Sequence, residues 1–159
     1  MNRNTVLVAL GLFVVGYGTN VSTPFLVLYR DRLGLSANAT QLIFVVYVVG
    51  ILSTLMIAGQ ISDRYGRKRL LITSLALSAL GSAILIGGRD SFALLLMGRV
   101  ILGIVSGLGL GVGAAWLQEL MGPAQQHKAA LVATLVTYGG FGAAPPLSVL
   151  YEWLGPSPL

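Results

Sequence analysis

The sequence contains no cysteine and only one histidine among its 159 residues. Without cysteine the chain can form no disulfide, no thiolate metal site and no cysteine nucleophile. The one histidine, His127, stands beside Lys128 and is predicted to be a solvated loop residue. No serine is evidently placed to pair with it as in an intramembrane protease, and there is no phosphate-binding loop for ATP. We therefore expect no metal, no cofactor and no enzymatic activity.

Charged residues are also scarce. They make up 9% of the chain, while hydrophobic residues make up 55%; a soluble domain carries about a quarter charged residues. A membrane span takes about 20 mostly apolar residues. Five stretches satisfy this: residues 5–29, 41–60, 70–88, 92–117 and 128–153. The sequence predicts one all-α polytopic membrane domain over residues 1–159.

A secretory signal peptide is an alternative interpretation of the N-terminus. The first apolar stretch, residues 5–29, is much longer than a signal core of about 7 to 15 residues. It is also not followed by a small-residue cleavage site and a soluble domain. We therefore interpret it as the first membrane span.

The net charge of +5 would suggest a nucleic-acid partner in a soluble protein. Here most basic residues flank apolar stretches, which is typical of the positive-inside rule for membrane proteins. With a cytoplasmic N-terminus, the inner side carries Arg3, Arg64, Arg67, Lys68, Arg69 and Lys128, and the outer side carries Arg30, Arg32 and Arg89. We expect a multi-pass protein of the cell membrane in this orientation, in contact with membrane lipids and not with nucleic acid.

The segment AGQISDRYGRKRLL, residues 58–71, gathers charges between the second and third stretches. Asp63 and Gly66 have the spacing of a tight turn, with Asp first and Gly fourth. Gly59 precedes Asp63 by one helical turn, so it would let a neighbouring helix approach the carboxylate closely. The basic residues alone are explained as a positive-inside anchor, but that explanation does not account for Gly59, Asp63 and Gly66 at this spacing.

This segment closely resembles motif A of the major facilitator superfamily of secondary transporters, Gly-x-x-x-Asp-Arg-x-Gly-Arg-Lys/Arg-Lys/Arg, in the loop between helices two and three. In that family the motif is held to brace the outward-facing state. Its Asp and Arg engage a helix of the other half of the transporter and a charge-relay partner. The resemblance implies a gating set made of Gly59, Asp63, Arg64, Gly66, Arg67 and Lys68. Residues 28–47 look like the corresponding region of bacterial drug-efflux-type members.

Arg99 is the only charged residue well inside a predicted span. Burying it costs at least about 2.5 kcal/mol, so we expect it to face protein or water and to be functional. Snorkelling to the outer head groups is the alternative. Followed by Gly103 and Gly107, it resembles motif B of the same family, whose arginine is associated with proton coupling; Leu102 stands where that motif usually has glutamine. The glycines themselves predict tight helix packing.

Polar residues lie on one face of the first and fifth spans. Tyr17 and Asn20 share a face of the first, and Thr137, Tyr138 and Phe141 share a face of the fifth. These five are candidates to line a central cavity. The alternative is that they are hydrogen-bond partners between helices. The Gly- and Pro-rich residues 139–146 resemble the antiporter motif C only weakly, and the prolines should bend the helix.

No Asp or Glu lies in the apolar core of a predicted span. Asp31 and Glu152 fall at outer ends and Glu119 at an inner end, and we expect all three to be exposed. If the protein couples transport to protons, the titrating acid is one of these or lies elsewhere.

Taken with the resemblance, the sequence predicts five transmembrane helices of an incomplete N-terminal six-helix half, ending before helix six. The expected function is secondary transport of an unidentified small solute, with efflux and proton coupling implied by the resemblance alone. The missing C-terminal half of the same transporter is then the expected partner. Two alternatives are a small oligomerising scaffold without transport activity and a small intramembrane enzyme.

Overall fold

The computed structural model describes residues 2–88 and 90–154, and these fold into helices joined by short turns. The elements are α1 (Arg3–Asn20), α2 (Phe25–Leu33), α3 (Ala37–Tyr65), α4 (Arg67–Gly87), α5 (Phe92–Leu108), the π-helical turn η1 (Gly109–Gly113), α6 (Ala114–Met121), the 3₁₀ turn η2 (Pro123–Gln125) and α7 (Gln126–Leu154). Because α5, η1 and α6 are continuous, they form one long rod. The structure confirms the predicted all-α fold.

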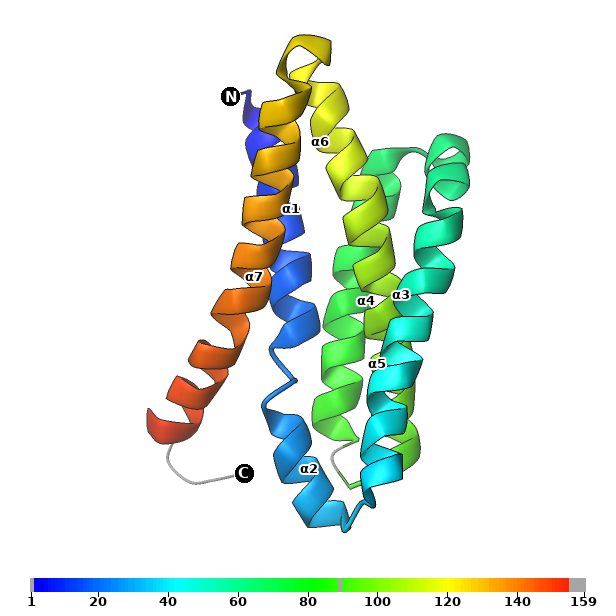
Figure 1. The fold of residues 1–159 in the computed structure, drawn as a ribbon, viewed down its shortest axis with the longest axis vertical. Helices are drawn as coiled ribbons and strands as arrows, with labels where there is room; N and C mark the ends of the chain where they lie inside the picture. Colours follow the sequence, from blue (N-terminus) through cyan, green and yellow to red (C-terminus); the bar gives the residue numbers. More distant parts are fainter. Residues whose placement is uncertain (1, 89, 155–159) are drawn as a thin grey trace.

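The helices form two groups that are joined along their length. α1 packs along α7, and α3, α4 and α5 form a second group, as seen in Figure 1. α1 also contacts α4, α6 and η1, which joins the two groups. The N-terminus, the α3–α4 turn and the α6–α7 connection lie at one end of the bundle, and α2 lies at the other. This arrangement places the basic residues of the α3–α4 turn at the same end as Arg3.

Within the described residues, three helical stretches are long and apolar enough to cross a membrane: Ala37–Tyr65, Arg67–Gly87 and Phe92–Met121. Large apolar side chains cover much of their outer surface; Met56, for example, is 82% exposed. Surface of this kind is unfavourable in water but suits a lipid environment. The chain is therefore a membrane-embedded helical protein.

The expected first span, residues 5–29, is not one helix. α1 ends at Asn20, residues 21–24 form a turn, and α2 begins at Phe25. Pro24 stands at the N-cap of α2 and has no N–H to continue the hydrogen-bond ladder of α1. Thr23 donates a side-chain hydrogen bond to Oδ1 of Asn20 at 2.8 Å, which closes the turn locally. The length of the apolar stretch alone did not indicate this break.

Glycines allow α3 and α5 to approach closely, as their spacing predicts. A Cβ on Gly107 would lie 2.7 Å from the carbonyl oxygen of Ile51, and one on Gly103 would collide with the carbonyl oxygen of Tyr47. Gly103 and Gly107 of α5 therefore pack against α3 of the same chain.

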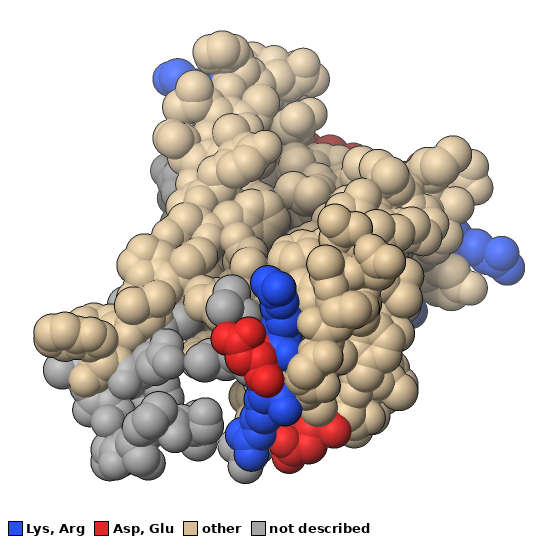
Figure 2. Space-filling view, turned by 60° about the horizontal axis from the view of Figure 1, so that its bottom comes forward, with Lys and Arg blue, Asp and Glu red and all other residues tan. Residues whose placement is uncertain are grey.

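Two apolar clusters hold the ends of the bundle. Toward the N-terminal end, Val8 and Leu12 of α1 pack with Leu71 of α4 and Leu117 of α6. Toward the other end, the cluster is built of Leu26, Ile43, Leu85, Leu95 and Leu102. At that end Arg32 pairs with Asp90 at 3.0 Å. Figure 2 shows acidic and basic side chains next to one another on the end of the molecule that is turned forward. The side chains of Arg89 and Glu152 lie outside the described residues.

Candidate functional site

The reversal between α3 and α4 takes place at Gly66 alone. Asp63 and Tyr65 are still helical, so the expected four-residue turn beginning at Asp63 is wrong. Gly66 has φ +85, a conformation that side chains disfavour, and its N–H donates to the carbonyl of Ser62 at 2.9 Å. One glycine therefore ends α3 and starts α4, and it sets Asp63 and Arg67 on either side of the corner.

Arg67 forms an ion pair with Glu119 of α6, with 2.5 Å between Nη2 and Oε1. The arginine side chain is 22% exposed and the glutamate 58%. The sequence predicted Glu119 to be an exposed edge charge and did not give it a partner. It is exposed, but it also connects the start of α4 to the end of α6. The sequence signal was present: apart from Asp63 at the end of α3, Glu119 is the only acid at the N-terminal end.

The Arg67 guanidinium also has a buried nitrogen, Nη1, for which the described residues provide no hydrogen-bond partner. The ion pair lies beside a cavity of about 420 Å³ lined by Arg67, Ala115, Gln118, Glu119, Gly122, Pro123 and Gln126. Arg67 therefore keeps a hydrogen-bond donor, Nη1, that is not used by the described residues.

Gly59 and Asp63 face away from the packed side of α3. A Cβ on Gly59 would meet nothing within 4 Å, and both residues are exposed. The close helix contact expected at Gly59 is therefore not made by the described part of this chain. Arg64 lies over the ring of the neighbouring Tyr65, 5.7 Å from its centroid, and Lys68 lines a separate pocket beside Arg3. The structure thus brings Arg67 to Glu119 and leaves Gly59 and Asp63 on an open surface.

Arg99 is only 2% exposed, so its side chain is covered by protein and does not extend to the head groups. Its guanidinium lies 5.7 Å from the ring centroid of Tyr47, whose hydroxyl is 3.1 Å from Oγ of Ser106. Nε and Nη2 of Arg99 are buried, and residues 2–88 and 90–154 give neither a hydrogen-bond partner. Leu102, in the place of the family's glutamine, is fully buried in an apolar cluster. The site is a desolvated cation against an aromatic face.

The polar residues of the first and fifth spans meet where α1 packs on α7. Asn20 donates through Nδ2 to the backbone carbonyl of Phe141 at 3.2 Å. Tyr138 is 68% exposed and its ring packs edge-on to Phe141, with 6.2 Å between centroids. Thr137 is buried, and Tyr17 is partly buried. Asn20 thus serves as a partner between helices, and cavity lining by the set stays a prediction.

The family model for the Major Facilitator Superfamily matches residues 8–158. Similar proteins include the human facilitated glucose transporter member 12 of solute carrier family 2, 29% identical over 83% of this chain and 21% of its own length. In Bacillus subtilis they include the arabinose-proton symporter, 29% identical over 91% of this chain and 32% of its own. The bacillibactin exporter of the same bacterium is 31% identical over 65% of this chain and 27% of its own.

The chain therefore spans about a fifth to a third of the length of these relatives. The match of the family model covers nearly all of the chain, including α3, the Gly66 corner and the Arg67–Glu119 pair. The chain belongs to the Major Facilitator Superfamily.

Proposed function

We propose that this chain is part of a secondary transporter that moves a small solute across the cell membrane by alternating access, with its N-terminus in the cytoplasm. Its family comprises transporters, not enzymes. These relatives are about three to four times as long as the chain, so the proposed transporter includes helices beyond these 159 residues. Solute would bind between this part and the missing half, and rocking of the halves would expose it alternately to each side.

The observation that carries the proposal is the Arg67–Glu119 ion pair next to the open surface of Gly59 and Asp63. A gate contact must form in one state and break in the other, so each interaction in it must be weak. Ion pairs that solvent screens contribute only about 0 to 1 kcal/mol, and the Glu119 side of this pair is 58% exposed, which meets that requirement. At Gly59 no side chain blocks a second helix, and Asp63 can accept hydrogen bonds from that helix. We assign the contact to a helix of the missing half.

Arg99 is the candidate for coupling solute movement to a proton. Its buried charge has Nε and Nη2 without partners among the described residues, so it would respond strongly to a carboxylate that changes its protonation nearby. A relative named as an arabinose-proton symporter supports a proton as the coupling ion. Tyr47 would hold the guanidinium in place during the cycle.

The relatives are named for chemically different solutes, sugars and a bacillibactin, so their names do not define a substrate. We propose efflux of a small organic solute, supported by the bacillibactin exporter and the resemblance of residues 28–47 to efflux-type members. The scaffold alternative relied on glycine faces for oligomerisation. Gly103 and Gly107 are occupied by α3, which disfavours that alternative.

The test is proton-driven ethidium uptake into inverted membrane vesicles containing the full-length transporter. We expect uptake that stops when an uncoupler removes the proton gradient, and at least a tenfold loss in Asp63→Asn and in Arg67→Ala at unchanged membrane levels. Arg69→Ala is the matched control, because Arg69 is an exposed cation of the same corner and belongs to neither ion pair of the described chain. Ethidium uptake that does not depend on the proton gradient, or equal uptake by all variants, would overturn the proposal.

A further inference from the structure

The rod formed by α5, η1 and α6 changes its packing partners at η1. Before η1, α5 packs against α3 and α4; beyond η1, α6 packs on α7 and α1. Figure 1 shows the same change, with α5 beside α3 and α4, and α6 directed toward α7. The two parts of one continuous helix therefore belong to the two helix groups of the bundle, and η1 is where they are joined.

The α-helical hydrogen-bond ladder is interrupted at η1. Bonds in a π turn join residues five apart instead of four, and such turns are among the places where long helices bend. The N–H of Gly109 is shared between the carbonyls of Val105 and Ser106. Directly after the turn, the N–H of Ala114 donates to the carbonyl of Gly111, only three residues back. Three of the five residues of η1 are glycine, so its backbone is easier to bend than that of α5 or α6.

α1 and α3 hold η1 in place from two sides. A Cβ on Gly109 would lie 2.7 Å from Cγ1 of Val15 in α1. A Cβ on Gly111 would lie 3.0 Å from Cβ of Ala58 in α3. Because both neighbours already pack this closely against the backbone of η1, the turn itself has little room to shift. A bend there would instead change the angle between α5 and α6.

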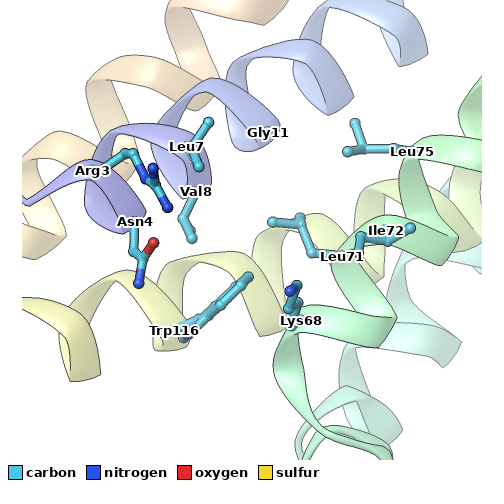
Figure 3. A pocket seen from close by; sticks show the side chains of 10 residues that line it. All are labelled: Arg3, Asn4, Leu7, Val8, Gly11, Lys68, Leu71, Ile72, Leu75 and Trp116. Atoms are coloured by element: carbon cyan, nitrogen blue, oxygen red, sulfur yellow. The ribbon is translucent and has the colours of Figure 1, made fainter.

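Within this chain, α6 is held less closely than α5. Nine of the 17 residues of α5 are buried, but only one of the eight residues of α6, Leu117. Trp116 of α6 borders a pocket of about 380 Å³, and Figure 3 shows it between side chains of α1 and α4. The ion pair of Arg67 with Glu119 joins α6 to the start of α4. If that pair opens, α6 can change its angle with the loss of few close contacts.

We propose that η1 is a hinge and that the Arg67–Glu119 ion pair keeps it closed. When the pair opens, α6 tilts away from the start of α4 and takes the start of α7 with it, while α5 stays against α3 and α4. A bend of about 20° over the eight residues of α6, a length of about 12 Å, moves its far end by about 4 Å. This movement lies within the chain and is additional to the proposed rocking of the two halves.

Distances between two spin labels test the hinge in a full-length transporter freed of any cysteine outside this chain, which has none of its own. The first pair, Arg69→Cys with Ala124→Cys, joins the start of α4 to the turn after α6. The reference pair, Arg69→Cys with Ala93→Cys, lies on α4 and α5 alone. All three positions are exposed. We expect Glu119→Gln to lengthen the first distance by about 4 Å and to leave the reference distance unchanged.

Gly111→Ala tests the turn itself. Alanine has the better helix propensity, and its Cβ needs only a small adjustment of α3, so it should stiffen η1. Added to Glu119→Gln, it should at least halve the lengthening. The matched control is Gly139→Ala in α7, where the new Cβ would lie 3.8 Å from the ring of Phe13 and should leave the lengthening unchanged.

Three results would overturn the hinge. They are no lengthening in Glu119→Gln, as when another helix of the transporter holds α6 in place, equal lengthening of both distances, and equal effects of the two alanine substitutions. The distances are measured without any solute or proton gradient. Failure of the hinge is therefore distinguishable from failure of the transport proposal, which is tested by ethidium uptake.

Discussion

Asn20 donates a hydrogen bond to a carbonyl that Pro145 deprives of its usual intrahelical donor. In an α-helix the carbonyl of Phe141 would accept from the N–H of residue 145, but that residue is proline. The Asn20 side chain, at the end of α1, donates to this carbonyl at 3.2 Å instead. The break after α1 and the proline of α7 are thus joined by one hydrogen bond, and helices with such interruptions need partners of this kind inside a membrane.

We predict that Asn20→Leu lowers the free energy of unfolding by about 1 kcal/mol, a typical value for an interhelical hydrogen bond in a membrane protein. The same substitution should cost much less in a Pro145→Ala background, because alanine at this position provides the missing N–H to the Phe141 carbonyl. Unfolding in mixed micelles of the four proteins of this double-mutant cycle measures the coupling. Equal costs in the two backgrounds would show that the side chain does not serve the proline.

Gly103 and Gly59 should respond in opposite ways to alanine. At Gly103 the new Cβ would collide with the Tyr47 carbonyl, so the free energy of unfolding should fall by about 1 to 3 kcal/mol. At Gly59 the Cβ would meet no atom within 4 Å. The better helix propensity of alanine should therefore raise the free energy of unfolding by up to about 1 kcal/mol. Chemical denaturation of the 159-residue chain checks both.

The same Gly59→Ala substitution should reduce uptake by the full-length transporter, because a second helix is proposed to pack there. Higher stability together with lower transport would assign this glycine to a contact outside the chain. Unchanged transport would leave Gly59 as an ordinary lipid-facing residue.

Exchange of the charges at Arg67 and Glu119 tests the ion pair. We expect Arg67→Glu or Glu119→Arg alone to reduce ethidium uptake at least tenfold, because two like charges would lie at the contact. The double exchange should restore part of the uptake. The effect on unfolding should stay within about 1 kcal/mol, since both groups are partly exposed. If the double exchange is as inactive as the single ones, the pair does not act as a unit.

Arg99→Leu should separate stability from transport. A buried ion replaced by an apolar side chain often leaves stability unchanged or higher, so we expect no loss in the free energy of unfolding. Uptake should become independent of the proton gradient if Arg99 couples the proton. Destabilisation with gradient-dependent uptake would make Arg99 a structural residue held by Tyr47.

The sequence predicted the features that depend on residues close together in the chain, namely the helices and the close packing at glycines. Apolar length located the helices, and the spacing of Gly103 and Gly107 predicted the close packing of α3 on α5. The first span is broken at residues 21–24, inside its polar segment GYGTNVSTP (residues 16–24), because the backbone there depends on Pro24 and on side-chain hydrogen bonds. The bond from Asn20 was within reach of sequence reasoning, since Pro145 frees the carbonyl of Phe141. For Arg67, the scarcity of acids at the N-terminal end leaves only Asp63 and Glu119 as possible partners, but which of the two it pairs with depends on how α4 and α6 pack.

Maleimide labelling of Gly59→Cys tests the central claim most directly. This chain has no cysteine of its own, so in a full-length transporter freed of any others the new thiol is the only target. We predict fast labelling in the 159-residue chain, where Gly59 is open, and in the full-length transporter a labelling rate that differs at least tenfold with and without the proton gradient. Labelling that is equally fast in every case would contradict a gate at this surface.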